Sequence, residues 1–105
     1  MIIKNYTPHE VNIVLENGEK INLPSVGLAR CTQTTVPDGV IGDIPITKTR
    51  FGEVEGLPDP EKGAFFIVSR LVMQAAKNRK DLLVPNEIIR DDTGRIVGCK
   101  SLANN

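Results

Sequence analysis

His9 is the only histidine of the chain, and it lies in a Thr-Pro-His-Glu segment that is typical of a turn. A histidine there could act as a general base or bind an anion, although a surface role is the more common one. A zinc site normally needs three or four protein ligands, and only Cys31 and Cys99 could join His9. The two cysteines are far apart in the sequence, so we expect free thiols, no metal and no cofactor.

Glu53 and Glu55 form the second candidate group. Because they lie two residues apart, both side chains can face the same side of an extended chain. Paired carboxylates can hold a divalent cation or share acid–base chemistry, which with His9 would make a small hydrolase or nuclease. No Asp-x-Asp-x-Asp-Gly pattern accompanies them, and a solvated acidic loop is the plainer interpretation.

Arg79 and Asp81 form the third group, on either side of Lys80. A guanidinium and a carboxylate at this spacing can lock a loop to the end of a strand, or Arg79 can contact a phosphate or carboxylate ligand. The chain has no phosphate-binding glycine loop, no nucleophile elbow and no His-Glu-x-x-His. We therefore assign no catalytic residue. The sequence favours a noncatalytic protein, although it leaves the question of enzyme activity open.

Alternating aliphatic residues indicate the elements that must position these side chains. Residues 11–15 and 20–23 flank Asn17-Gly18, which predicts a β-hairpin with a type I′ turn. Residues 28–36 are rich in β-branched side chains and predict a third strand. Pro37-Asp38-Gly39 predicts a turn, and residues 40–51 predict one or two further strands.

The second half of the chain contains the only predicted helix. Residues 52–63 are rich in Gly, Pro and acidic residues and predict an irregular loop. The apolar run 64–68 is typical of a strand buried on both faces, and Ser69 is placed to cap a helix over residues 70–78. Extended chain at 81–85 and a hairpin closed by Gly94 complete the pattern.

The predicted fold is therefore α+β and mainly β, in a single domain over residues 1–105. We expect a small mixed or antiparallel sheet, or a barrel-like one, with one short helix packed on it. Aromatic residues are scarce, with no Trp, one Tyr and three Phe, so the core must be aliphatic.

Charge and hydropathy narrow the functional classes. The formal net charge is zero, which argues against a nonspecific nucleic-acid binder. Residues 1–62 carry a net charge of −3 and residues 63–105 a net charge of +3, an asymmetry that would allow homo-oligomers to form. No apolar run approaches the length of a membrane span, and no secretory signal is recognised, so we expect a cytoplasmic protein.

Three motifs carry a resemblance to a known family. They are Asn-x-Thr-Pro-His at 5–9, Gly-Glu-Val-Glu-Gly-Leu-Pro at 52–58 and Arg-x-Asp-Leu-Leu-Val-Pro at 79–85. Together they resemble a family of short uncharacterised proteins of bacteria, prophages and phages, over nearly the whole chain. Tyr6 stands where that pattern has Leu. The resemblance implies a bacterial or phage setting and no particular chemistry.

The motif residues define the expected binding site, because they fall in loops and turns whereas the strands carry aliphatic side chains. We expect a noncatalytic binding protein that sequesters a small polar ligand, such as a nucleotide-derived signal, or blocks a host protein. The alternatives are the hydrolase or nuclease described above and a structural or assembly component. The candidate ligand-binding residues are Asn5, Thr7, His9, Glu53, Glu55, Arg79 and Asp81.

Overall fold

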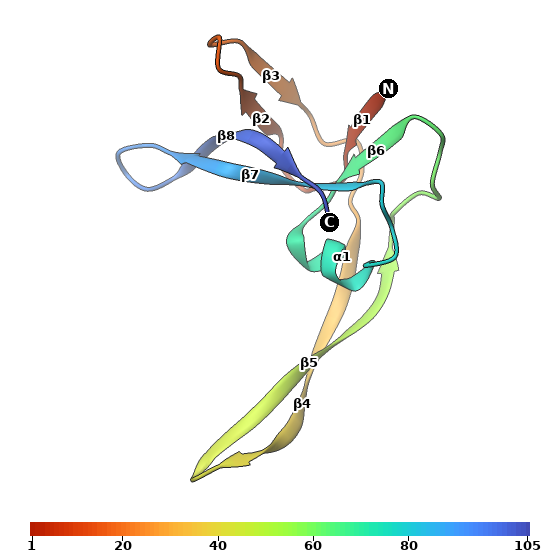
Figure 1. Cartoon of the computed structure of the whole chain (residues 1–105), viewed down its shortest axis with the longest axis vertical. Helices are drawn as coiled ribbons and strands as arrows, with labels where there is room; N and C mark the ends of the chain where they lie inside the picture. The colour runs from red at the N-terminus through yellow and green to blue at the C-terminus, as the bar shows by residue number, and fades with distance from the viewer.

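The chain folds into a six-stranded mixed sheet with a long two-stranded ribbon projecting from it (Figure 1). The structure is a computed structural model that describes residues 1–105. The sheet has the strand order β1-β6-β7-β8-β2-β3, and the ribbon consists of β4 and β5. The elements are β1 (Ile2–Asn5), β2 (Val11–Val14), β3 (Lys20–Leu23), β4 (Arg30–Ile41), β5 (Ile44–Glu55), β6 (Ala64–Ile67), α1 (Arg70–Ala75), β7 (Leu82–Arg90) and β8 (Ile96–Ala103).

The predicted fold class is confirmed, including the barrel-like character of the sheet. Strands β1, β6 and β7 pair in parallel, as do β2 and β8, whereas β7 with β8 and β2 with β3 are antiparallel. An isolated bridge between Asn5 and Ser25 links the end of β1 to the segment after β3, so that the sheet nearly closes. No helix of the chain has the length and apolar character needed to cross a membrane.

Strand β6 lies at the centre of the core, as its continuous apolar run predicts. Phe66 and Val68 contribute to one buried cluster, and Ile67 to a second cluster on the opposite face. This division follows from the alternation of side chains along a strand. Helix α1 covers the first cluster with Val72 and Met73, and the hydroxyl of Ser69 accepts a hydrogen bond from the amide of Val72, which confirms the predicted cap.

Three predicted boundaries are wrong, and each error has a local cause. The helix ends at Ala75 rather than at residue 78, because Ala76 already has non-helical φ and ψ angles. Residues 52–55 belong to β5, since their pairing with β4 overrides the low strand propensity of Gly and Glu. Pro37-Asp38-Gly39 is not a turn but an irregularity within β4, and the ribbon reverses at Gly42-Asp43 instead.

Both predicted hairpins form, with one difference in turn geometry. In the β2–β3 hairpin only Gly18 has a positive φ, whereas a type I′ turn would need one at Asn17 as well. The amide of Leu15 donates to the carbonyl of Glu19, which closes a three-residue loop. In the β7–β8 hairpin Gly94 has the expected positive φ of 86°.

The ribbon, called the β4–β5 arm below, gives the molecule its elongated shape. Its two twelve-residue strands run away from the sheet and helix to a free end (Figure 1). The radius of gyration is 16.5 Å, against about 13 Å for a compact chain of this length. Most side chains of the arm are exposed, so that only its base, beside α1 and β6, contributes to the core.

Candidate functional site

The turn between β1 and β2 is held together by the Asn5 side chain. Asn5 is 1% exposed, and its amide group donates to the carbonyls of His9 and Leu23, both at 2.8 Å. Its side-chain oxygen accepts from the Thr7 amide at 2.9 Å and from the Thr7 hydroxyl at 2.6 Å. The predicted site residues Asn5 and Thr7 therefore use their polar groups to fix this turn, and the His9 ring is left exposed.

Replacing Thr7 with Val tests this assignment, because the change removes the hydroxyl but preserves the branched shape. We expect the free energy of unfolding to fall by about 1 kcal/mol, the net value of a typical hydrogen bond. Thr35→Val, at an exposed position of β4, is the matched control and should change stability by less than about 0.5 kcal/mol. Equal urea midpoints for both variants would contradict the structural role of Thr7.

Arg79 and Asp81 form a two-pronged ion pair at the start of β7. Arg79 Nε donates to Asp81 Oδ1 at 2.8 Å, and Arg79 Nη2 donates to Asp81 Oδ2 at 2.7 Å and to the Pro58 carbonyl at 3.0 Å. The side chains are 21% and 16% exposed, so the pair is mostly shielded from water. The hydrogen bonds from Arg79 hold the pKa of Asp81 below its ordinary value.

Two aromatic rings extend this cluster into the core. The Arg79 guanidinium lies 6.0 Å from the centroid of the buried Phe66 ring, and Tyr6 meets the same ring edge to face at 5.6 Å. Cation–π and edge-to-face contacts both stabilise such an arrangement. The first motif, through Tyr6, and the third, through Arg79, therefore meet on Phe66.

Glu53 and Glu55 lie on β5 near the base of the arm. With Arg30, Cys31 and Thr32 of β4 they line an open hollow of about 430 Å³. Glu55 forms an ion pair with Arg30 at 3.9 Å, but both side chains are 72% exposed, and such surface pairs contribute little to stability. The alternation of β5 places both glutamates on the same face, as predicted.

The predicted site residues do not share one cavity. His9 lines none of the five main cavities of the protein, so the structure does not bring it into the hollow of Glu53 and Glu55. No group of three or more His, Cys, Asp and Glu side chains lies close enough to hold a metal ion. Cys31 is half-buried and Cys99 buried, and both are free thiols.

What the three motifs share is contact with the base of the arm. The Tyr6 carbonyl accepts from the amide of Ala29, the residue before β4. Gly56, the residue after β5, passes so close to the Leu28 carbonyl that an added Cβ would lie 2.1 Å from its oxygen. Arg79 holds the next loop through Pro58. The motif residues thus form the joint that fixes the arm to the body.

The free end of the arm is a site that sequence reasoning missed. Val40, Ile41 and Ile44 surround the Gly42-Asp43 turn, and each is about two-thirds exposed. We call these three residues the arm tip. Gly42 has a φ of 59° at the first turn position, where a type II′ hairpin turn requires glycine. A Gly-Asp pair between two β-branched runs was the signal that could have located this tip.

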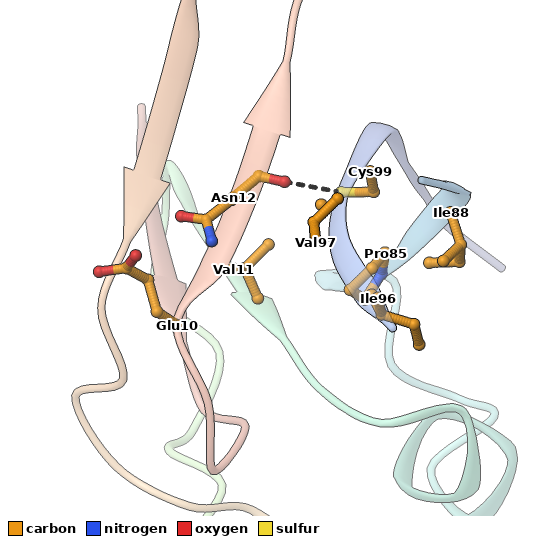
Figure 2. Close-up of a pocket in the computed structure, with 9 residues that line it drawn as sticks. Glu10, Val11, Asn12, Pro85, Ile88, Ile96, Val97 and Cys99 are labelled. Atoms are coloured by element: carbon orange, nitrogen blue, oxygen red, sulfur yellow. Dashed lines mark hydrogen bonds between the residues drawn. The ribbon is translucent and has the colours of Figure 1, made fainter. Parts of the chain in front are cut away.

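A second missed feature is a groove of about 160 Å³ between β2 and β8 (Figure 2). Five apolar side chains line it, and we call it the β2–β8 groove: Val11, Pro85, Ile88, Ile96 and Val97. The Cys99 thiol closes its inner end by donating to the Asn12 carbonyl at 3.6 Å. Burial raises the pKa of that thiol.

Comparison with known proteins gives no further indication of the site's role, because no protein-family model, curated protein or solved structure matches this chain.

Proposed function

We propose that this chain is a noncatalytic binding protein of bacterial or phage origin that contacts a protein partner with its β4–β5 arm. The observation that supports this proposal is the exposed arm itself. A two-stranded hairpin that stands alone in water is only marginally stable, and it gains stability when a further surface covers it. The arm exposes three aliphatic side chains at its end, on both sides of the Gly42-Asp43 turn.

The joint at the base of the arm supports the same proposal. Contacts of Tyr6, Gly56 and Arg79 fix where the arm leaves the body. A fixed arm loses less conformational entropy when it binds than a flexible loop would, because its direction is already set. The polar motif residues then serve binding indirectly, by holding the binding element in place.

Ile41→Asp tests the proposal at the arm tip. Ile41 is 69% exposed, so the change should alter the free energy of unfolding by less than about 0.5 kcal/mol. A charge placed in an apolar contact should weaken binding by about 30-fold or more, which is the effect of a residue that dominates an interface. The measurement is capture, by the immobilised wild-type or variant chain, of the chain itself or of proteins from a bacterial lysate.

Val26→Asp is the matched control, since Val26 is 59% exposed but lies outside the arm. Capture by wild type and by Val26→Asp, with loss in Ile41→Asp, is the expected result. If Ile41→Asp captures the same proteins as wild type with the same retention, the arm is not the binding element.

A small polar ligand is the second candidate, and the hollow beside Glu53 and Glu55 supports it. Its volume of about 430 Å³ lies within the range of small-molecule sites, and it offers both a cation and two carboxylates. Calorimetric titration with nucleotides tests this version. Heat of binding that disappears in Arg30→Ala and persists in Ile41→Asp would favour the ligand over the protein partner.

A further inference from the structure

One side of the outer β4–β5 arm carries a connected set of aliphatic and basic side chains. Residues two apart in a strand share a face, and so do residues directly opposite one another in an antiparallel pair. The alternation along β5 and its register with β4 therefore define one face of the outer arm. We call this set the arm face: Thr34, Val36, Ile41, Ile44, Ile46, Lys48 and Arg50.

The middle of the arm face is aliphatic and is incompletely covered within one chain. Val36 and Ile46 are only half-buried, and Ile41 and Ile44 are 69% and 66% exposed. The outer arm runs free of the body (Figure 1), and none of these four side chains belongs to either core cluster. Apolar surface of this kind gains free energy when a second apolar surface removes it from water.

Four charged side chains of the outer arm have no ion-pair partner within the chain. Asp38 and Asp43 lie towards the free end, whereas Lys48 and Arg50 lie on the arm face closer to the body. All four are exposed, and the chain's two ion pairs lie elsewhere, at the base of the arm and at the start of β7. The arm thus has an acidic end followed by a basic middle.

The spacing of these charges is self-complementary about a two-fold axis across the arm. The register shift in β4 places Asp38 at the level of Ile46, two residues from the level of Lys48. In an antiparallel second arm with the axis beside Ile46, Asp43 would lie over Arg50 and Asp38 over Lys48. The midpoints of these two pairs differ by about half a residue, or roughly 2 Å at the rise of a strand. One axis therefore brings both pairs together.

The remaining charges of the arm stay outside this overlap. Arg30, Glu53 and Glu55 lie at the base, and a second arm centred on Ile46 would end near the level of Arg50. Its acidic end stops about 10 Å short of Glu53, because three strand residues separate the two levels. The antiparallel arrangement therefore opposes unlike charges and covers the aliphatic centre without placing like charges over one another.

We infer that two copies of this chain associate through their arm faces, packed antiparallel about a two-fold axis beside Ile46. The inference rests on the proposed function, because it names the protein partner of the arm. The contact joins the same surface on both copies, so it closes as a dimer. Opposite charges at its rim guide association and fix its register. The arm face has far fewer residues than the about 20–30 of a standard interface, so we expect dissociation at about micromolar concentrations.

A charge exchange between two variants tests this arrangement. One variant carries Lys48→Glu and Arg50→Glu, and the other carries Asp38→Lys and Asp43→Lys. Each variant alone places like charges over one another, so we expect its self-affinity to fall by about 10-fold or more. Their equimolar mixture opposes unlike charges at every pair and should form a heterodimer with about the wild-type affinity. Sedimentation velocity over a concentration series measures the species, and melting curves establish that each variant is folded.

Two further proteins serve as controls. A chain with all four substitutions restores the unlike pairs in reversed order and should self-associate like wild type. The matched control combines Lys62→Glu with Lys77→Glu, which makes the same change in net charge as the first variant, at exposed positions outside the arm. It should also dimerise like wild type.

Each other outcome overturns the inference. If wild type is monomeric at every concentration, or if neither charge-reversed variant loses affinity, the arm faces of two copies are not in contact. If both variants lose affinity and their mixture does not regain it, the arms do not pack antiparallel about this axis. The proposed function is tested separately: loss of a captured lysate protein in Ile41→Asp would give the arm a different partner, and unchanged capture would remove the proposed function as well.

Discussion

Gly56→Ala is expected to lower the free energy of unfolding by about 3 kcal/mol, a large share of the stability of a small domain. Two costs combine at this position. Gly56 has a φ of 82°, which alanine adopts only with strain, and its added Cβ would lie 2.1 Å from the Leu28 carbonyl oxygen. The backbone must move where the arm leaves the body. Chemical denaturation with a fluorescence or circular-dichroism signal measures the loss.

Gly63→Ala separates these two costs. Gly63 lies in the same loop, with a similar φ of 78°, but an added Cβ there would meet nothing within 4 Å. It should lose only the conformational cost, about 1 kcal/mol. If both variants lose the same amount, the close approach of Gly56 to Leu28 has no energetic weight and the proposed joint is not tight. Gly56→Ala should also weaken arm-dependent binding, which Gly63→Ala should preserve.

Arg79→Ala is expected to cost about 2–3 kcal/mol of stability, between the values for surface and fully buried ion pairs. The substitution leaves the Asp81 carboxylate and the Pro58 carbonyl without their donors in a mostly shielded position. It also removes the cation that lies over the Phe66 ring. Thermal and urea unfolding of the two proteins at neutral pH measure the difference.

The same pair predicts how stability depends on pH. Because Arg79 lowers the pKa of Asp81 below the ordinary value of 3.8, the folded state favours the ionised carboxylate. This contribution is fully present above the unfolded-state pKa and is lost as the pH falls through the folded-state pKa. The stability difference between wild type and Arg79→Ala should therefore shrink on acidification below about pH 4.

Two control variants identify the source of the effect. Lys80→Ala removes an exposed neighbouring cation and should stay within about 0.5 kcal/mol of wild type. Arg79→Lys keeps the charge but cannot form the two-pronged contact, so an intermediate loss is expected. A stability difference between wild type and Arg79→Ala that is constant down to pH 2 would show that Asp81 is not coupled to Arg79 in the folded state.

The local elements of this fold could be predicted from residues close together in the chain. The hairpin at 11–23 follows from alternating side chains and turn residues, and the buried strand around Phe66 from its apolar run. The helix cap at Ser69 follows from a hydroxyl that can accept from an amide of the first helical turn. In the arm, the residue pattern predicts the turn at Pro37-Asp38-Gly39, whereas the chain reverses at Gly42-Asp43. The pairing of β4 with β5 decides where the chain reverses, and the residue pattern of one strand carries no information about that pairing.

In the candidate site, too, the local sequence indicates which residues matter, and distant contacts decide their role. The motif residues could be singled out as polar positions in turns, but their role depends on partners distant in the sequence, such as Pro58 for Arg79 and Leu23 for Asn5. Local spacing cannot reveal such partners. It suggested a shared pocket for these residues, whereas the contacts distribute them around the base of the arm.

The sequence alone determined that the fold is mainly β with one short helix, because side-chain periodicity and turn residues act over a few residues at a time. Only the tertiary structure decided that residues 30–55 project as an arm, that the motif residues hold its base, and that the tip and the β2–β8 groove remain uncovered. Those features depend on which apolar surfaces find partners after the chain has folded. Burial is a property of the whole packed chain, and the same alternating pattern is compatible with a strand in the core and a strand in solvent.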